Sequence, residues 1–376
     1  MGSPPTFVFG APLVQPISPE TWSFSSLRTF DECPYKWAVS KLTIPKFNGP
    51  IPEKPSKRSL EGILLHGLIE RYEHDVRKGC GNKFRPRRTL LEMIQEWSKS
   101  NEANPRINSK ALAGQVRLEE LLRAFSEAAS YISTSDHHNT SGTPSTSQRP
   151  RVFDGAESWL KDPKSKLCGQ ADLIIRGKII DFKSGDKQEH HIHQIIYYAA
   201  LYLAITGRMP TELRLIYTEN NESLHVPLPD KNVLESLLTE FRQRAKKVDQ
   251  QVVAGDLPAK PDSTKCSYCH VRGICVKYWE SIDYRVIEQA NVIDYAPTPL
   301  SIFESAALGV YICDDVAGFR TNLHLPQEVA DKIGVNSRSI RCLALRVNAG
   351  PKGVKFSFTQ NSEVYVVDAG ERKEEI

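Results

Sequence analysis

Residues 169–206 constrain the fold of this chain more than any other segment. Gly169–Ile175 and Lys178–Lys183 are rich in apolar and β-branched residues, and Arg176-Gly177 between them is typical of a tight turn, so the sequence predicts a two-stranded hairpin. A helix is expected next, from about His190 to Thr206. Its apolar run of 11 residues, Ile195–Ile205, is too short to span a bilayer and is typical of a buried helix.

Two carboxylates lie within the apolar hairpin. Asp172 and Asp181 are each surrounded by residues that favour burial, and a buried carboxylate is costly unless a cation compensates it. Two such groups on one hairpin favour a divalent cation with oxygen ligands. Lys183 lies two residues beyond Asp181, hence on the same sheet face, where an ammonium can stabilise charge developing on a phosphate. The alternative is a surface ion pair between Asp181 and Lys183 on an edge strand.

Two neighbouring helices carry further polar pairs. A strongly periodic helix is expected to begin at Ser59, and it places His66 and Glu70 four residues apart beside its apolar stripe. His66 should therefore point inward, either as a ligand or as a hydrogen-bonded core histidine. Gln194 and Tyr198 lie four residues apart on one face of the helix that follows the hairpin.

Together these residues resemble the RecB-type branch of the PD-(D/E)XK nuclease superfamily. Four spaced pairs carry the resemblance, and they occur in the order of the family: Gly62 to His66, Gly169 to Asp172, Asp181 to Lys183, and Gln194 to Tyr198. The resemblance covers residues 20–285 and implies an α/β fold, restriction-endonuclease-like, with a mixed central sheet flanked by helices.

The resemblance also implies roles for these positions. His66, Asp172 and Asp181 are expected to bind Mg²⁺ or Mn²⁺, assisted by the Phe182 carbonyl, and Lys183 to act as the catalytic lysine. Gln194 and Tyr198 are expected to contact the nucleic-acid backbone or brace the site. Glu157 matches an additional catalytic acid of the family. The reaction implied is hydrolysis of a phosphodiester by metal-activated water.

Cysteines form a second constellation. Cys266, Cys269 and Cys275 need a fourth ligand to complete a metal site, and Cys33 is the candidate because the chain lacks the second close pair of a zinc ribbon. The arrangement resembles the iron–sulfur RecB-type nucleases, the group that includes AddB and the exonucleases of CRISPR adaptation, so a structural [4Fe–4S] cluster is favoured over Zn²⁺. A buried apolar thiol is the alternative for each cysteine, and the interpretation for Cys80, Cys168, Cys313 and Cys342.

Charge gives weaker information, because the net charge is only +4. A basic run without acids contains Arg85, Arg87 and Arg88, which are candidate DNA-phosphate contacts beside a nuclease site and otherwise a solvated face. The histidines at 190, 191 and 193 are interpreted as a solvated helix start. The chain shows no signal-peptide pattern, so a cytoplasmic protein without membrane contact is expected, with its cysteines as thiols or metal ligands.

The expected organisation is a nuclease core over residues 1–285 and a small β-rich domain of unknown role over 286–376. The core includes a helical insertion at about 59–132 and a Ser/Thr-rich flexible loop at 133–150. One helix is expected from Ser25 or Ser26 to about Leu42, and a strand at Arg151–Phe153.

The sequence therefore predicts a metal-dependent DNA nuclease, most simply an exonuclease on single-stranded or frayed DNA ends. One alternative is a DNA-binding or scaffold subunit that keeps the fold and does not cut. Another is a subunit active only inside a larger repair or defence complex, in which residues 286–376 dock a protein partner. No phosphate loop for ATP is present.

Overall fold

The computed structural model describes residues 4–9, 17–42, 51–133, 155–219, 222–297, 302–305, 309–316, 319–333, 338–350, 353–359 and 361–368. The chain divides into two units by its contacts. Unit 1 contains residues 1–17, 29–53 and 254–376, and unit 2 contains residues 18–28 and 54–253. The boundary expected near residue 285 falls within unit 1.

A five-stranded mixed sheet forms the centre of unit 2. Its order is β2-β3-β4-β5-β6, and only β4 and β5 run parallel to each other. The strands are β2 (Gly155–Lys161), β3 (Cys168–Ile175), β4 (Lys178–Lys183), β5 (Glu212–Tyr217) and β6 (Glu222–Val226). Arg176 and Gly177 both have positive φ (51° and 78°), which gives the β3–β4 hairpin the backbone of a two-residue turn.

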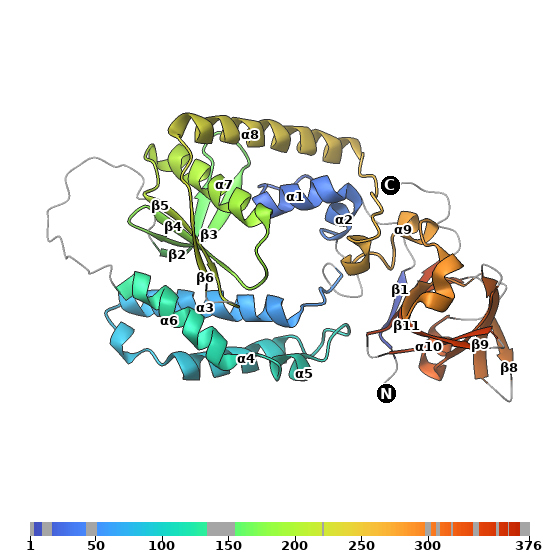
Figure 1. Cartoon of the computed structure of the whole chain (residues 1–376). Coiled ribbons are helices and arrows are strands. Elements are labelled where there is room, and N and C mark those ends of the chain that lie inside the picture. The colour runs from blue at the N-terminus through green and yellow to red at the C-terminus, as the bar shows by residue number, and fades with distance from the viewer. Residues whose placement is uncertain are drawn as a thin grey trace, which may run out of the picture. The chain divides into compact units, whose positions relative to one another are not determined.

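Helix α7 (Glu189–Thr206) makes the crossover between the parallel strands β4 and β5, as such strands require. It ends at Gly207, whose φ of 70° suits glycine. Helix α8 (Lys231–Ala254) packs outside α7, where the Tyr197 and Phe241 rings meet edge-on at 4.7 Å. Both helices lie on one side of the sheet (Figure 1).

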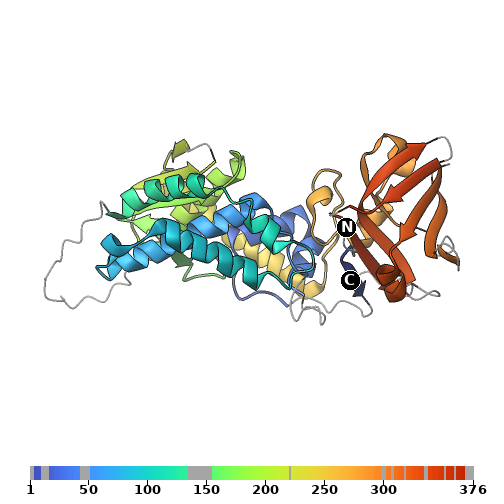
Figure 2. The ribbon, with the colours of Figure 1, turned by 90° about the horizontal axis from the view of Figure 1, so that it is seen from below.

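The opposite face of the sheet packs against a helical layer. Helices α3, α4 and α6 run side by side there (Figure 2), and their apolar faces meet Leu173, Ile180 and Phe182 of the sheet. The Ser56 hydroxyl caps the first turn of α3. Shortening a fully buried side chain such as Leu68 to Ala should cost about 2–5 kcal/mol. The helices are α3 (Lys57–Arg77), α4 (Pro86–Ser100), α5 (Ser109–Ala113) and α6 (Leu118–Ser133), with η2 (Gly81–Lys83) between α3 and α4.

Unit 1 contains an eight-stranded sheet of order β1-β13-β11-β12-β10-β9-β8, with β7 paired to β11. The early strand β1 pairs in parallel with the late strand β13, from Thr6 opposite Val364 to Phe9 opposite Val367. The strands are β1 (Thr6–Phe9), β7 (Val292–Tyr295), β8 (Ile302–Ser305), β9 (Gly309–Val316), β10 (Phe319–Leu325), β11 (Arg338–Gly350), β12 (Gly353–Ser357) and β13 (Glu363–Asp368). Short helices accompany them: α2 (Pro34–Val39), η3 (Cys266–Tyr268), α9 (Val276–Glu280), η4 (Tyr284–Gln289) and α10 (Gln327–Ile333).

The fold class predicted from the sequence is confirmed, including the β-rich C-terminal part. The single helix expected up to Leu42 is wrong, because α1 (Phe24–Glu32) ends before Cys33 and α2 begins at Pro34. Proline has no N–H to continue a helix, and Cys33 instead adopts extended backbone and caps α2. The expected loop at 134–150 and strand at 151–153 lie outside the described residues. No described helix combines the length and apolar character needed to cross a bilayer.

Candidate metal centre

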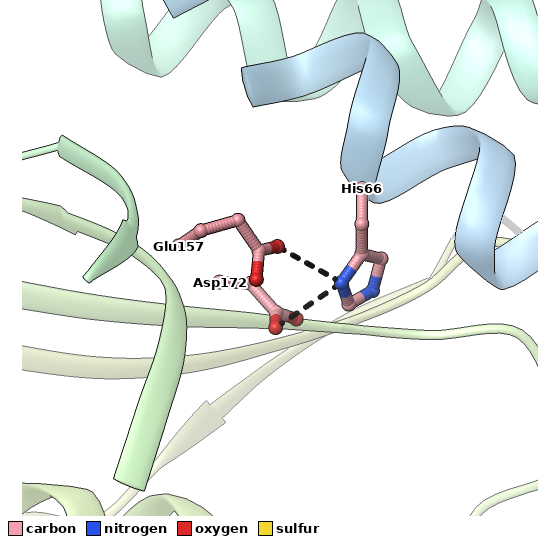
Figure 3. A group of neighbouring side chains, drawn as sticks. All are labelled: His66, Glu157 and Asp172. Carbon is pink, nitrogen blue, oxygen red and sulfur yellow. Dashed lines mark hydrogen bonds and ion pairs between the residues drawn. The ribbon is translucent and has the colours of Figure 1, made fainter. Parts of the chain in front are cut away.

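Three elements of unit 2 bring His66, Glu157 and Asp172 together. His66 Nδ1 on α3 lies 3.2 Å from Glu157 Oε1 on β2 and 3.4 Å from Asp172 Oδ1 on β3. Figure 3 shows both carboxyl groups turned toward the same edge of the imidazole. One ligand atom from each residue lies within 4.8 Å of the other two, so the group offers one nitrogen and two oxygen donors to a metal ion.

Glu157 reaches this group from a strained backbone. Its neighbours Ala156 and Ser158 pair with Leu173 and Ala171, so Glu157 lies opposite Asp172 in the ladder. Its φ is 49°, a left-handed value that few residues other than glycine adopt and that is uncommon inside a strand. Such strain persists where the surrounding structure imposes it, which is frequent at functional sites.

Asp172 also fixes the end of the hairpin. Backbone pairing between β3 and β4 reaches Leu173 opposite Ile180, so Asp172 and Asp181 occupy the next facing positions. There the Phe182 amide donates to Asp172 Oδ2 at 2.6 Å instead of to a strand carbonyl. The side chain of Asp172 thus replaces a ladder hydrogen bond and is held with one oxygen toward His66.

Lys183 is held by a chain of side-chain contacts. Its ammonium lies 2.5 Å from Asp181 Oδ2 and donates to Gln194 Oε1 at 2.7 Å. The Gln194 amide in turn donates to the Tyr198 hydroxyl at 2.8 Å. Lys183 therefore cannot swing freely, and its charge points into the face that carries the carboxylates.

The electrostatics of the group favour a bound cation. Burial alone would lower the pKa of His66, but the Asp172, Glu157 and Asp181 carboxylates raise it to about 9. Burial and the neighbouring Asp172 raise the pKa of Asp181, and Lys183 opposes that shift. Asp181 is fully buried, and its Oδ2 contacts the Lys183 ammonium. Several buried carboxylate oxygens beside an imidazole fit a small divalent cation.

The basic run predicted to contact phosphates lies between η2 and the first turn of α4 in unit 2 and is not part of the donor set. Arg87 pairs with Glu119 and Arg88 with Glu92, and Arg85 donates to the carbonyls of Asn82 and Phe84. Arg85, Arg88 and Lys83 line a polar surface hollow of about 750 Å³ that extends to Ala156, next to Glu157. Their role in DNA binding stays a prediction.

The interpretation of the histidine run as a solvated helix start is wrong for His191. Its side chain is buried, and its Nδ1 lies 3.3 Å from the hydroxyl of Tyr217, the residue paired with Lys183 across β4 and β5. Burial and the charge of Lys183 lower the pKa of His191 to about 4, so it is neutral. Its position one turn before Gln194 is the sequence signal that points to this inward face.

The four predicted cluster cysteines lie near one another in unit 1. Burial raises the pKa of Cys275 to about 11, and the Cys33, Cys269 and Cys266 thiols add to that shift. The Cys33 sulfur accepts the Lys36 amide at 3.4 Å, and the Cys266 sulfur accepts the Asp262 amide at 3.3 Å. No described cysteine is in a disulfide.

The family model of the PD-(D/E)XK nuclease superfamily matches residues 21–276. The chain belongs to this superfamily. Membership implies metal-dependent hydrolysis of phosphodiesters, and the matched span contains the carboxylate group, Lys183 and the four cysteines. No curated protein matches the chain. The strands from β7 onward lie beyond the matched span.

Proposed function

We propose that this member of the PD-(D/E)XK superfamily is a RecB-type, Mg²⁺- or Mn²⁺-dependent deoxyribonuclease that acts on single-stranded or frayed DNA ends. One observation carries the proposal: a nitrogen-and-oxygen donor set lies close to Asp181, whose charge acts on His66, and Asp181 contacts a lysine that is already held in place. That combination serves phosphodiester hydrolysis and has little use in a purely structural site.

His66, Glu157 and Asp172 would hold the metal ion, with the Asp181 carboxylate beside them. A bound divalent cation supplies Lewis acidity for the phosphate and lowers the pKa of the attacking water. Lys183 places its ammonium where charge develops on the phosphate oxygens. Because Gln194 and Asp181 hold it before substrate arrives, little reorganisation is needed during the reaction. Gln194 and Tyr198 act by positioning Lys183.

A structural [4Fe–4S] cluster at Cys33, Cys266, Cys269 and Cys275 belongs to the same proposal. The Cys33, Cys266 and Cys269 thiols lie close enough to Cys275 to raise its pKa, and backbone amides donate to the Cys33 and Cys266 sulfurs. This gathering supports a four-thiolate metal site, and the preference for iron–sulfur over Zn²⁺ follows from the resemblance to the iron–sulfur RecB-type nucleases.

Cleavage of end-labelled single- and double-stranded DNA with Mg²⁺, Mn²⁺ or EDTA tests the nuclease. The parent should cut with either metal and not in EDTA, and Asp172→Asn should abolish cutting. Asp186→Asn is the matched control, because this exposed aspartate pairs with Arg58 away from the donor set. Cutting in EDTA would refute the metal scheme. Metal binding without cutting by the purified chain would favour the subunit that works only inside a complex.

A further inference from the structure

Trp159 is exposed on β2, two residues beyond Glu157. Its side chain is 58% exposed, although Ser158 and Leu160 on either side of it are buried. Strand β2 is an edge strand of the five-stranded sheet, so no strand among the described residues pairs with its free side. A large indole left in water on a well-anchored strand is unusual for a side chain whose burial is strongly favourable.

The strand register places Trp159 on the side of the sheet from which α3 brings His66. Leu160 pairs with Gly169, which faces Tyr198 and Leu201 of α7, and neighbouring residues of a strand point to opposite faces. Trp159 and its partner Gln170 therefore face the layer that contains α3. Gln170 also donates to the Glu157 carbonyl at 3.5 Å. At about 3.3 Å of rise per residue, Trp159 lies about 7 Å along the strand from Glu157, within reach of a nucleoside whose phosphate is at the metal centre.

The pattern continues with a cation. Lys161 is exposed at the next alternate position of β2 and has no ion pair among the described residues. Along the edge strand the chain thus presents a carboxylate, an aromatic ring and a lysine at every second position. A strand of nucleic acid repeats phosphate and base in the same way, and proteins bind single strands by combining base stacking with phosphate contacts.

We propose that Trp159 is a stacking platform for an unpaired nucleobase next to the scissile phosphate, and that Lys161 contacts a neighbouring phosphate. The site deepens the proposed nuclease function, on which it rests, by giving the chain a preference for single strands. A base inside a duplex already stacks on both neighbours, so the indole can stack on an unpaired base and not on an internal base pair.

Binding in a Lys183→Met background with Mn²⁺ tests the platform, measured by fluorescence anisotropy of labelled oligothymidylate. Trp159→Ala should weaken single-strand binding about 5- to 150-fold, the range measured for one stacked base. Blunt duplex binding should change less than twofold, and Trp159→Phe should stay within about threefold of the parent. Lys161→Ala should lower the slope of log affinity against log salt by about 0.7. Val233→Ala, an exposed apolar position on α8, should change nothing.

An abasic residue moved along the oligonucleotide gives an independent measurement. In the Lys183→Met background, the abasic residue at one position should weaken binding about as much as Trp159→Ala does. In the protein that also carries Trp159→Ala, the abasic residue at that position should not weaken binding further. Additive losses at every position, or equal losses on single strand and duplex, would overturn the platform. A parent chain that cuts neither DNA with any metal would refute the nuclease and leave this binding test valid.

Discussion

Metal binding should release about one proton near neutral pH. In the metal-free protein the Asp172 and Glu157 carboxylates raise the pKa of His66 to about 9, so the imidazole is protonated at pH 7. A metal ion that takes Nδ1 must displace this proton. Because of the raised pKa, the proton competes with the metal ion for His66 Nδ1 below pH 9 and no longer competes above it.

The size of the effect follows from that pKa. At pH 7, two units below 9, deprotonation of His66 costs about 2.7 kcal/mol, so Mn²⁺ should bind about 100-fold more weakly than at pH 9 or above. The apparent affinity should rise about tenfold per pH unit and level off near pH 9. Burial and Asp172 raise the pKa of Asp181 to about 7, so a second proton adds to this competition as the pH falls to 7 and below.

Calorimetry of Mn²⁺ binding at pH 8 in two buffers of different ionisation enthalpy counts the released protons. The parent should release about one, and His66→Asn close to none. Glu157→Gln removes one of the groups that raise the His66 pKa, so release should fall below the parent value. The control His193→Asn, an exposed residue of α7, should match the parent. Tight Mn²⁺ binding by the parent with no proton release would refute the assignment of His66.

Three further changes have definite expected outcomes. Lys183→Met should slow cleavage by at least about 100-fold while Mn²⁺ affinity stays within a few-fold, and cleavage within threefold of the parent would argue against a catalytic lysine. Cys33→Ala should remove the broad visible absorption and iron of anaerobically purified protein, whereas Cys80→Ala should not; stoichiometric zinc without iron in the parent would replace the cluster with a zinc site. Arg242→Ala leaves the buried Asp162 carboxylate without its ion-pair partner and should lower the free energy of unfolding by about 3–5 kcal/mol in urea titrations. A loss under about 1 kcal/mol would mean that the ion pair behaves as a solvent-exposed one.

The sequence predicts the hairpin and its helix well, because their apolar patterns are local. The expected strands Gly169–Ile175 and Lys178–Lys183 agree with β3 and β4 to within one residue, and the expected helix agrees with α7. The fixed register of β3 and β4 brings three positions to one face of the hairpin, namely Asp172, Asp181 and Lys183.

The features that the sequence does not predict depend on contacts between residues far apart in the chain. Glu157 matches the family pattern only loosely by spacing, and its left-handed backbone arises from pairing of β2 with β3. His191 looks solvated in a run of histidines, but Tyr217, from the second strand of the parallel pair, covers it. The apolar spacing also does not predict that the helix breaks at Cys33, where the thiol caps the start of α2.

The pairing of β1 with β13 affects how the chain is synthesised. Thr6 and its partner Val364 are 364 − 6 = 358 residues apart, so β1 leaves the ribosome long before the strand it pairs with. At about 5–20 residues per second this wait lasts about 20–70 s. Unit 2 is almost continuous over residues 54–253 and is complete well before then. Unit 2 should thus fold during translation, and the sheet of unit 1 should close only after its last strand emerges, which leaves β1 unpaired in the interval.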